Sequence, residues 1–186
     1  MRLAGALIAG GRSRRFGRDK AIAELRGVRL ADLSLEVLRA GCDALVVAGP
    51  PALAASLGLE AVADALDLAG GPAAGIAAAL GWARADGFTH LVTAPCDTPA
   101  LPGDLVRRLA RAADAPVVAA WAARPHPLCA IWDVGGLADL RRSLAASHPP
   151  LRALVEQLGG RWLQFPDEAA FLNLNTEADL AALAGA

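Results

Sequence analysis

Lysine is nearly absent from this sequence. Of its 18 lysine and arginine residues only Lys20 is a lysine, and 19 aspartate and glutamate residues balance these cations. The formal charge of −1 excludes the positive field of a general nucleic-acid binder, so we expect no nucleic-acid partner. No apolar run approaches the ~20 residues that a transmembrane helix needs, so we expect no membrane partner either.

Cysteine is scarce as well. The three cysteines, Cys42, Cys96 and Cys129, are an odd number at wide spacing, which fits neither a disulfide framework nor a zinc cluster. The chain enters its first apolar segment without the charged and apolar regions of a secretory signal. These absences predict a protein of the reducing cytoplasm.

The apolar residues follow the pattern of an α/β protein. Strong strand candidates lie at residues 3–9, 44–48, 89–94 and 116–120, and weaker ones at 60–63, 128–132 and 161–165. The strong runs are apolar at odd and even positions alike, as in parallel strands covered on both faces. Helical patterns lie between the strands at residues 29–40, 52–57, 73–85, 102–112, 136–146, 150–158 and 177–183, and Thr176 can cap the last one.

This alternation predicts a three-layer α/β/α sandwich with a mostly parallel, Rossmann-like sheet and right-handed crossovers. The second half is less regular, and we expect an antiparallel strand there. Because the sequence contains no linker and no repeat, a single domain over residues 1–186 is the simplest organisation.

A glycine-rich segment, GGRSRRFGRDKA, follows the first predicted strand. Gly10 and Gly11 permit close approach of a ligand to the main chain, and the basic residues that end with Lys20 can neutralise a polyphosphate. Its spacing fits neither a Walker A loop nor a dinucleotide-binding fingerprint. The segment is either a phosphate-binding loop or an arginine-rich surface turn, and its place after the first strand favours the loop.

Two aspartates stand at the ends of predicted strands. Asp97 follows the strongest central strand, where a carboxylate can hold Mg²⁺ against nucleotide phosphates; the alternative is a turn-capping aspartate. Asp64 follows the strand at 60–63, and a glycine-rich turn at 70–76 leads into the next helix. That helix N-terminus favours an anion, although the turn is also consistent with a simple helix entry.

Asn173 and Asn175 lie on the same side of an extended segment, because side chains alternate along such a chain. Paired amides can read a heterocycle or a phosphate edge, whereas asparagines also commonly cap turns. His126, within Arg124-Pro125-His126-Pro127, is open to either a structural or a ligand-binding interpretation.

Taken together, these segments resemble the molybdenum cofactor guanylyltransferases, the MobA-type enzymes of the nucleotidyltransferase superfamily. The matching segments are LIAGGRSRRFGRDKA at residues 7–21, GGPAAGI at 70–76, PCDTPALP at 95–102, HPLCAIW at 126–132 and FLNLNTEADL at 171–180. They occur in the family's order and extend over nearly the whole chain.

The resemblance implies Mg²⁺-dependent transfer of GMP from GTP to the terminal phosphate of molybdopterin, with release of pyrophosphate. The nucleotide would contact the main chain of Ile8, Ala9, Gly10 and Gly11. Arg15 and Lys20 would bind phosphates, Asp64 would lie in the nucleotide site, Asp97 would coordinate Mg²⁺, and Asn173 and Asn175 would belong to the pterin side.

One departure from the family pattern concerns the end of the second strand. Some relatives carry an asparagine there, and this chain has Ala48-Gly49-Pro50. The resemblance further implies GTP and molybdopterin as partners, a transient contact with a molybdoenzyme or a cofactor-delivery chaperone, and a monomer.

Three other functions remain to be separated from this one. The nearest is a cytidylyltransferase of the same pterin or a sugar-phosphate nucleotidyltransferase, although the Ala-Gly-Gly and Asp-Lys steps resemble the guanylyl branch. The second is a non-catalytic nucleotide-binding module that delivers cofactor. The third is an NAD-binding oxidoreductase, which the missing fingerprint disfavours.

Overall fold

A seven-stranded sheet forms the centre of the molecule in the computed structural model, which describes residues 1–10, 20–63, 71–174 and 176–184. Its strands in chain order are β1 (Leu3–Ile8), β4 (Ala44–Ala48), β5 (Glu60–Val62), β6 (His90–Pro95), β7 (Val117–Ala122), β8 (Arg124–Asp133) and β9 (Arg161–Gln164). The spatial order is β5-β4-β1-β6-β8-β7-β9. Only β8 pairs antiparallel with its neighbours, so the expected antiparallel strand of the C-terminal half is confirmed.

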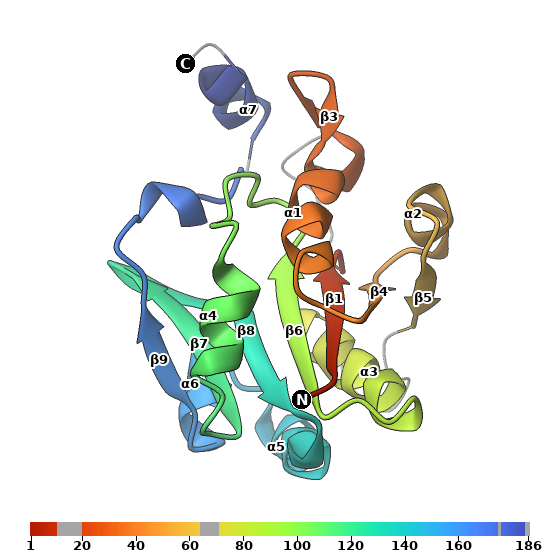
Figure 1. Cartoon of the computed structure of the whole chain (residues 1–186), viewed down its shortest axis with the longest axis vertical. Helices are drawn as coiled ribbons and strands as arrows, with labels where there is room; N and C mark the ends of the chain where they lie inside the picture. The colour runs from red at the N-terminus through yellow and green to blue at the C-terminus, as the bar shows by residue number, and fades with distance from the viewer. Residues whose placement is uncertain (11–19, 64–70, 175, 185–186) are drawn as a thin grey trace.

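Helices cover both faces of the sheet, which confirms the three-layer arrangement (Figure 1). One face carries α1 (Leu30–Arg39), α2 (Pro51–Ser56) and α4 (Leu105–Arg111). The other carries α3 (Pro72–Ala85), α5 (Leu137–Ser147) and α6 (Leu151–Gln157). Ala4, Ala6 and Ile8 of β1 face the α3 layer while Leu7 faces the α1 layer, which explains why this strand is apolar at both parities.

Short elements complete the described chain. They are the 3₁₀ turns η1 (Lys20–Ile22), η2 (Val134–Gly136) and η3 (Ala169–Phe171), the hairpin strands β2 (Glu24–Leu25) and β3 (Val28–Arg29), and the last helix α7 (Glu177–Ala184). Within the described part of the chain, no helix has the length and apolar character needed to span a membrane.

The β2–β3 hairpin is an element that the sequence patterns did not predict. Its turn uses Arg26 and Gly27, both with positive φ, which matches the primed turns typical of two-residue hairpin loops. Leu25 of the hairpin and Leu180 of α7 meet in a small apolar cluster that also contains Ala23, Leu30 and Leu174. The C-terminal helix therefore packs on the segment that follows Lys20, and Figure 1 shows both at the top of the molecule.

Two elements begin three or more residues away from the predicted start, while the other bounds differ by at most two residues. The helix predicted from residue 102 begins at Leu105, and the Pro102 carbonyl instead accepts a hydrogen bond from the Leu105 amide in a preceding turn. Strand β8 starts at Arg124 rather than at 128, because it continues as a hairpin with β7 past Pro125 and Pro127. The register shifts between Ala119 and Ala120 of β7, opposite the part of β8 that contains Pro127, which cannot donate a ladder hydrogen bond.

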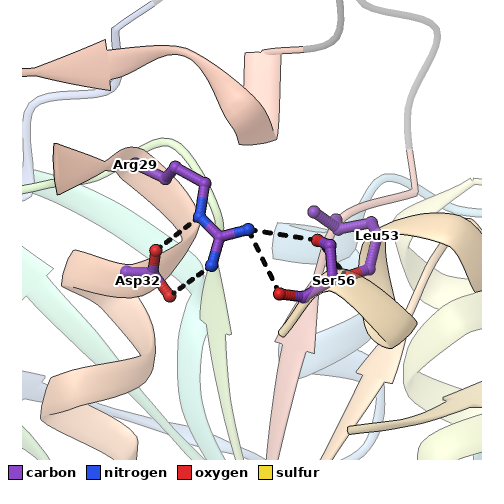
Figure 2. A network of polar contacts seen from close by, with 4 residues as sticks. All are labelled: Arg29, Asp32, Leu53 and Ser56. Carbon is purple, nitrogen blue, oxygen red and sulfur yellow. Dashed lines mark hydrogen bonds and ion pairs between the residues drawn. The ribbon is translucent and has the colours of Figure 1, made fainter. Parts of the chain in front are cut away.

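Polar contacts also fix the relation between α1 and α2. The Arg29 guanidinium makes two bonds to the Asp32 carboxylate, at 2.6 and 3.2 Å, and donates to the carbonyl and the hydroxyl of Ser56 at 3.3 and 3.2 Å (Figure 2). Ser56 Oγ in turn donates to the Leu53 carbonyl at 2.7 Å. The start of α1 is thereby tied to the last turn of α2, where a cation also interacts favourably with the helix dipole.

Candidate functional site

The strand order changes direction between β1 and β6. From β1 the chain builds outward through β4 to β5 and then returns to the other side of β1 to form β6, beside it in the sheet (Figure 1). Such a switch point opens a crevice beyond the carboxyl ends of the two strands. Ile8 pairs with Pro95 across this junction, so Ala9-Gly10 and Cys96-Asp97 leave the sheet at the same edge.

Main-chain hydrogen bonds define what the first loop can offer a ligand. The Ile8 carbonyl accepts from the Cys96 amide at 3.2 Å, and the Ala9 amide donates to the Ala48 carbonyl at 2.9 Å. These groups therefore belong to the sheet edge. Among the groups predicted to contact the nucleotide at Ile8, Ala9 and Gly10, the Ala9 carbonyl and the Gly10 amide take no part in these two hydrogen bonds.

Gly49 follows the last residue of β4, and no function was predicted for it. A Cβ at this position would lie 3.0 Å from the Ala9 Cβ and 3.1 Å from the Ala9 carbonyl carbon. Glycine thus permits the end of β4 to pass close against the main chain of Ala9. Ala48, where some relatives are expected to carry asparagine, is buried at the end of β4 and presents a methyl group there.

Asp97 is half-buried directly after β6, as predicted. Its carbonyl accepts a hydrogen bond from the Leu174 amide at 3.0 Å. The next residue, Thr98, is buried, and its hydroxyl lies 2.9 Å from Asn173 Oδ1 and 3.4 Å from Asp97 Oδ1. The fold therefore brings Asp97 and Asn173 together from distant parts of the sequence.

The turn that carries Asp97 is also held from the helix layer. Ser34 of α1 is fully buried and its hydroxyl lies 3.4 Å from the Thr98 carbonyl. Ser34, Thr93 and Thr98 are the buried polar residues in the described chain, and two of them support this turn. Buried hydroxyls are retained where they make hydrogen bonds, so this placement indicates a turn whose geometry is closely defined.

Metal binding by Asp97 is chemically consistent with its surroundings. No group of three or more histidine, cysteine, aspartate or glutamate side chains able to hold a metal occurs in the residues that the structure describes. Mg²⁺ does not need such a cage, because it is usually bound by one or two carboxylates together with substrate phosphates. A single carboxylate at the carboxyl end of β6 fits that ligand set.

Cys42 and Cys129 do not supply a nucleophile. Cys96 is partly buried against the core layer beneath the Asp97 turn. Burial raises the pKa of Cys42 to about 12 and raises the pKa of the fully buried Cys129 as well, with a further contribution from Asp97. A thiol with a raised pKa remains protonated and unreactive at neutral pH.

Helix α3 begins at the same edge of the sheet. It has Pro72 in its first turn and is preceded by Gly71, whose φ of 127° suits glycine. Among the described residues, no side chain caps its N-terminus. A helix of this length carries a partial positive charge at its start, so this end favours an anionic ligand near the crevice.

A pocket of about 280 Å³ lies beside the end of β6. It is lined by Pro95, Arg124, Pro125, His126, Pro127, Leu128, Cys129, Leu151 and Asn173. Asn173 was predicted on the pterin side, whereas the sequence analysis gave no function to Arg124. The only sequence signal for Arg124 was its position next to the Pro-His-Pro segment.

His126 forms part of the pocket wall and is half-buried. Its ring packs on Phe171 with centroids 4.8 Å apart. Burial lowers the pKa of His126, Arg124 lowers it further, and a hydrogen bond to the Ala122 main chain and the charge of Glu168 oppose the shift. Its Nε2 is buried and has no hydrogen-bond partner among the described residues. The ring is therefore neutral near pH 7.

A second hollow, of about 610 Å³, lies between η3 and α7. Asn173 separates it from the first pocket by contributing to both. Its wall is mostly apolar, with Leu172 and Leu183 partly open to solvent.

Several predicted site residues lie outside the described part of the structure. They are Gly11, Arg15, Asp64 and Asn175, together with the side chain of Lys20. The main chain of Lys20 begins η1, which packs against α1. Their expected contacts with the nucleotide stay predictions.

Comparison with known proteins agrees with this architecture. Residues 5–162 match the family described as the MobA-like NTP transferase domain. A protein of Cereibacter sphaeroides named molybdenum cofactor guanylyltransferase is 43% identical over 97% of this chain and 95% of its own length. A protein of the same name from Acidiphilium cryptum is 39% identical over 97% and 93%.

Solved structures show the same fold at lower identity. The molybdopterin-guanine dinucleotide biosynthesis protein A of Archaeoglobus fulgidus has a TM-score of 0.75 at 24% identity, covering 98% of this chain and 97% of its own. A Mycobacterium tuberculosis protein solved with manganese has a TM-score of 0.72 at 20% identity, over 100% of both chains. The chain belongs to the MobA-like NTP transferase family and is a nucleotidyltransferase.

Proposed function

We propose that this protein transfers GMP from GTP to the terminal phosphate of molybdopterin in a reaction that requires Mg²⁺ and releases pyrophosphate. One observation carries the proposal: Asp97 at the β1/β6 switch point is joined through Thr98 to Asn173, which lines the neighbouring pocket. A nucleotide crevice and an acceptor pocket thereby meet at one carboxylate. The names of relatives at 43% and 39% identity support the choice of substrates.

The residues divide into a donor side and an acceptor side. The Ala9 carbonyl, Gly10, the α3 N-terminus and the loop that ends at Lys20 form the donor side for GTP. Asn173, with Asn175 beyond it, belongs to the acceptor side. Asp97 lies between them and would hold Mg²⁺, which when bound neutralises the triphosphate and polarises the α-phosphate.

The chemistry needs no covalent enzyme intermediate. An oxygen of the acceptor phosphate attacks the α-phosphorus of GTP, and the bond from that phosphorus to the bridging β-phosphate oxygen breaks as pyrophosphate leaves. Since the acceptor oxygen is already anionic, no general base is required. The protein contributes alignment and positive charge, which are the principal factors in phosphoryl-type transfer.

The direct test is substitution of Asp97. Asp97→Asn keeps the shape and the main-chain bond to Leu174 but removes the charge, and it should lower turnover by about 100- to 1000-fold. Turnover is measured as pyrophosphate release from GTP with anaerobically prepared molybdopterin over a series of Mg²⁺ concentrations. The matched control, Asp104→Asn, changes an exposed carboxylate that pairs only with Arg107 among the described residues and should retain full activity.

The same assay separates the rival functions. Replacing GTP by CTP should abolish most product if the protein is a guanylyltransferase. A wild-type protein that binds GTP but releases no pyrophosphate would contradict the enzymatic proposal, and an Asp97→Asn variant with near-normal turnover would contradict the metal assignment.

A further inference from the structure

The proposed reaction brings together two anions, the triphosphate of GTP and the acceptor phosphate. The cations assigned so far all interact with the triphosphate. Arg15, Lys20 and an ion on Asp97 would neutralise the triphosphate of GTP. The acceptor phosphate has to approach the α-phosphorus from the opposite side, where no positive group has yet been assigned. Unless its charge is balanced there, repulsion between the two phosphates opposes the attack.

Most arginines in the described chain already have a partner. Arg2, Arg26, Arg29, Arg107, Arg108, Arg142, Arg152 and Arg161 bond to carboxylates or main-chain carbonyls. The arginines for which no ion pair or hydrogen bond is found among the described residues are Arg39, Arg84, Arg111, Arg124 and Arg141. Of these, Arg124 lines the pocket next to Asn173.

The main chain around Arg124 is well defined. Ala123 connects β7 to β8 as a turn with φ of 53°, and Ala122 pairs with Arg124 across it. Pro125 and Pro127 restrict the backbone that follows. Arg124 is thus presented from a rigid hairpin end and not from a long loop, which reduces the entropy lost when its guanidinium binds a ligand.

Arg124 is the charged residue among those that line the pocket. The other lining residues are apolar or neutral, and His126 is uncharged near neutral pH because burial and Arg124 lower its pKa. Pro95 forms the near wall of the pocket and is separated from Asp97 by Cys96 alone. A ligand in this pocket would therefore extend from Arg124 toward the carboxylate proposed to hold the metal.

We infer that Arg124 binds the terminal phosphate of the acceptor and that the Arg124–Asn173 pocket is the place where this phosphate is held for attack. This inference rests on the proposed function. A guanidinium suits the task, because it forms two parallel hydrogen bonds to a phosphate and stays charged at any physiological pH. Asn173, oriented by its bond from Thr98, lines the same pocket.

The experiment compares Arg124→Gln with the matched control Arg84→Gln, which removes another unpaired arginine, on α3 and outside the pocket. With wild-type turnover established, Arg124→Gln should raise KM for molybdopterin by about 10- to 100-fold and leave KM for GTP unchanged, as expected for loss of one charge-assisted hydrogen bond. For Arg124→Lys, KM for molybdopterin should lie between the values of the wild type and of Arg124→Gln. Thermal unfolding of each variant checks that the fold is intact.

A second measurement identifies the bound group. Dephosphorylated molybdopterin cannot accept GMP but can compete with the substrate, so its inhibition constant reports binding without the phosphate. Arg124→Gln should leave that constant unchanged while KM for molybdopterin rises. Equal weakening of both ligands would overturn the phosphate assignment, and so would a rise in KM for GTP or an unchanged KM for molybdopterin. An inactive wild-type protein would instead refute the proposed function itself.

Discussion

Thr98 shows how a single buried hydroxyl can define a site. Its one proton can be donated to Asn173 Oδ1 at 2.9 Å or toward Asp97 Oδ1 at 3.4 Å, and the shorter distance favours Asn173. With the proton on that side, the Thr98 hydroxyl does not compete with a cation for Asp97 Oδ1. Thr98 is therefore a positioning residue for Asp97 and for the Asn173 amide.

Thr98→Val should test this assignment. Loss of one buried hydrogen bond should cost about 1–2 kcal/mol of unfolding free energy and raise the Mg²⁺ concentration at half-maximal turnover several-fold, whereas Thr98→Ser should restore both. The control is Thr93→Val in the middle of β6, where the hydroxyl accepts from Trp132 Nε1 at 3.0 Å. It should lose similar stability with no change in Mg²⁺ dependence. Equal Mg²⁺ curves for both valine variants would remove the role of Thr98.

At the scale of elements, local sequence signals located most helices and strands. The predicted cap of α7 is confirmed: Thr176 Oγ1 accepts from the Asp179 amide at 3.1 Å, and the Thr176 amide donates to the Asp179 carboxylate at 2.8 Å. Proline was involved at the two element starts that were wrong by three or more residues. Pro102 precedes α4 without starting it, and Pro125 and Pro127 stay within β8 because they lie at its bulged end.

The joint between α1 and α2 gives an element-scale prediction. The Arg29–Asp32 pair is partly buried, and Arg29 also bonds to Ser56, so Arg29→Ala should lower the unfolding free energy by about 1 kcal/mol and Tm by about 2–4 °C. Arg142→Ala breaks an exposed pair with Asp139 at the same spacing and should change Tm very little. Differential scanning calorimetry on both variants decides the question, and an equal shift would show that the contact with Ser56 adds nothing.

At the scale of the whole molecule, two histidines couple folding to pH. Burial lowers the pKa of His90 below 6.5, with Asp133 opposing the shift, and burial with Arg124 lowers the pKa of His126 against Glu168. The unfolded chain therefore binds more protons than the folded one near pH 6. The stabilising contribution of the two histidines is therefore complete above about pH 7. It decreases as the pH falls through the pKa that these histidines have in the unfolded chain, and the decrease ends once the histidines of the folded chain are also protonated.

Urea unfolding at about pH 7.5 and about pH 5.5 should reveal this loss, and both values lie above the ordinary carboxylate range. His90→Gln and His126→Gln should each reduce the difference between the two pH values, and the double variant should reduce it most. If the difference persists unchanged in the double variant, other groups are responsible for the pH dependence.

The sequence by itself determined the local structure and the chemical inventory of this protein. Apolar runs at both parities predicted buried parallel strands, a glycine-rich segment predicted a ligand-binding loop, and Asp97 stood out at the end of a strand. These features could be predicted because backbone preference and side-chain burial act over a few residues.

Only the tertiary structure decided which of these residues meet. The pairing of Ile8 with Pro95 brings the first loop beside Asp97, and Thr98 joins Asp97 to Asn173. The β7–β8 hairpin then places Arg124 in the pocket that Asn173 also lines. Strand order and register result from packing the whole core at once, so contacts between such distant residues cannot be predicted from the segments taken separately.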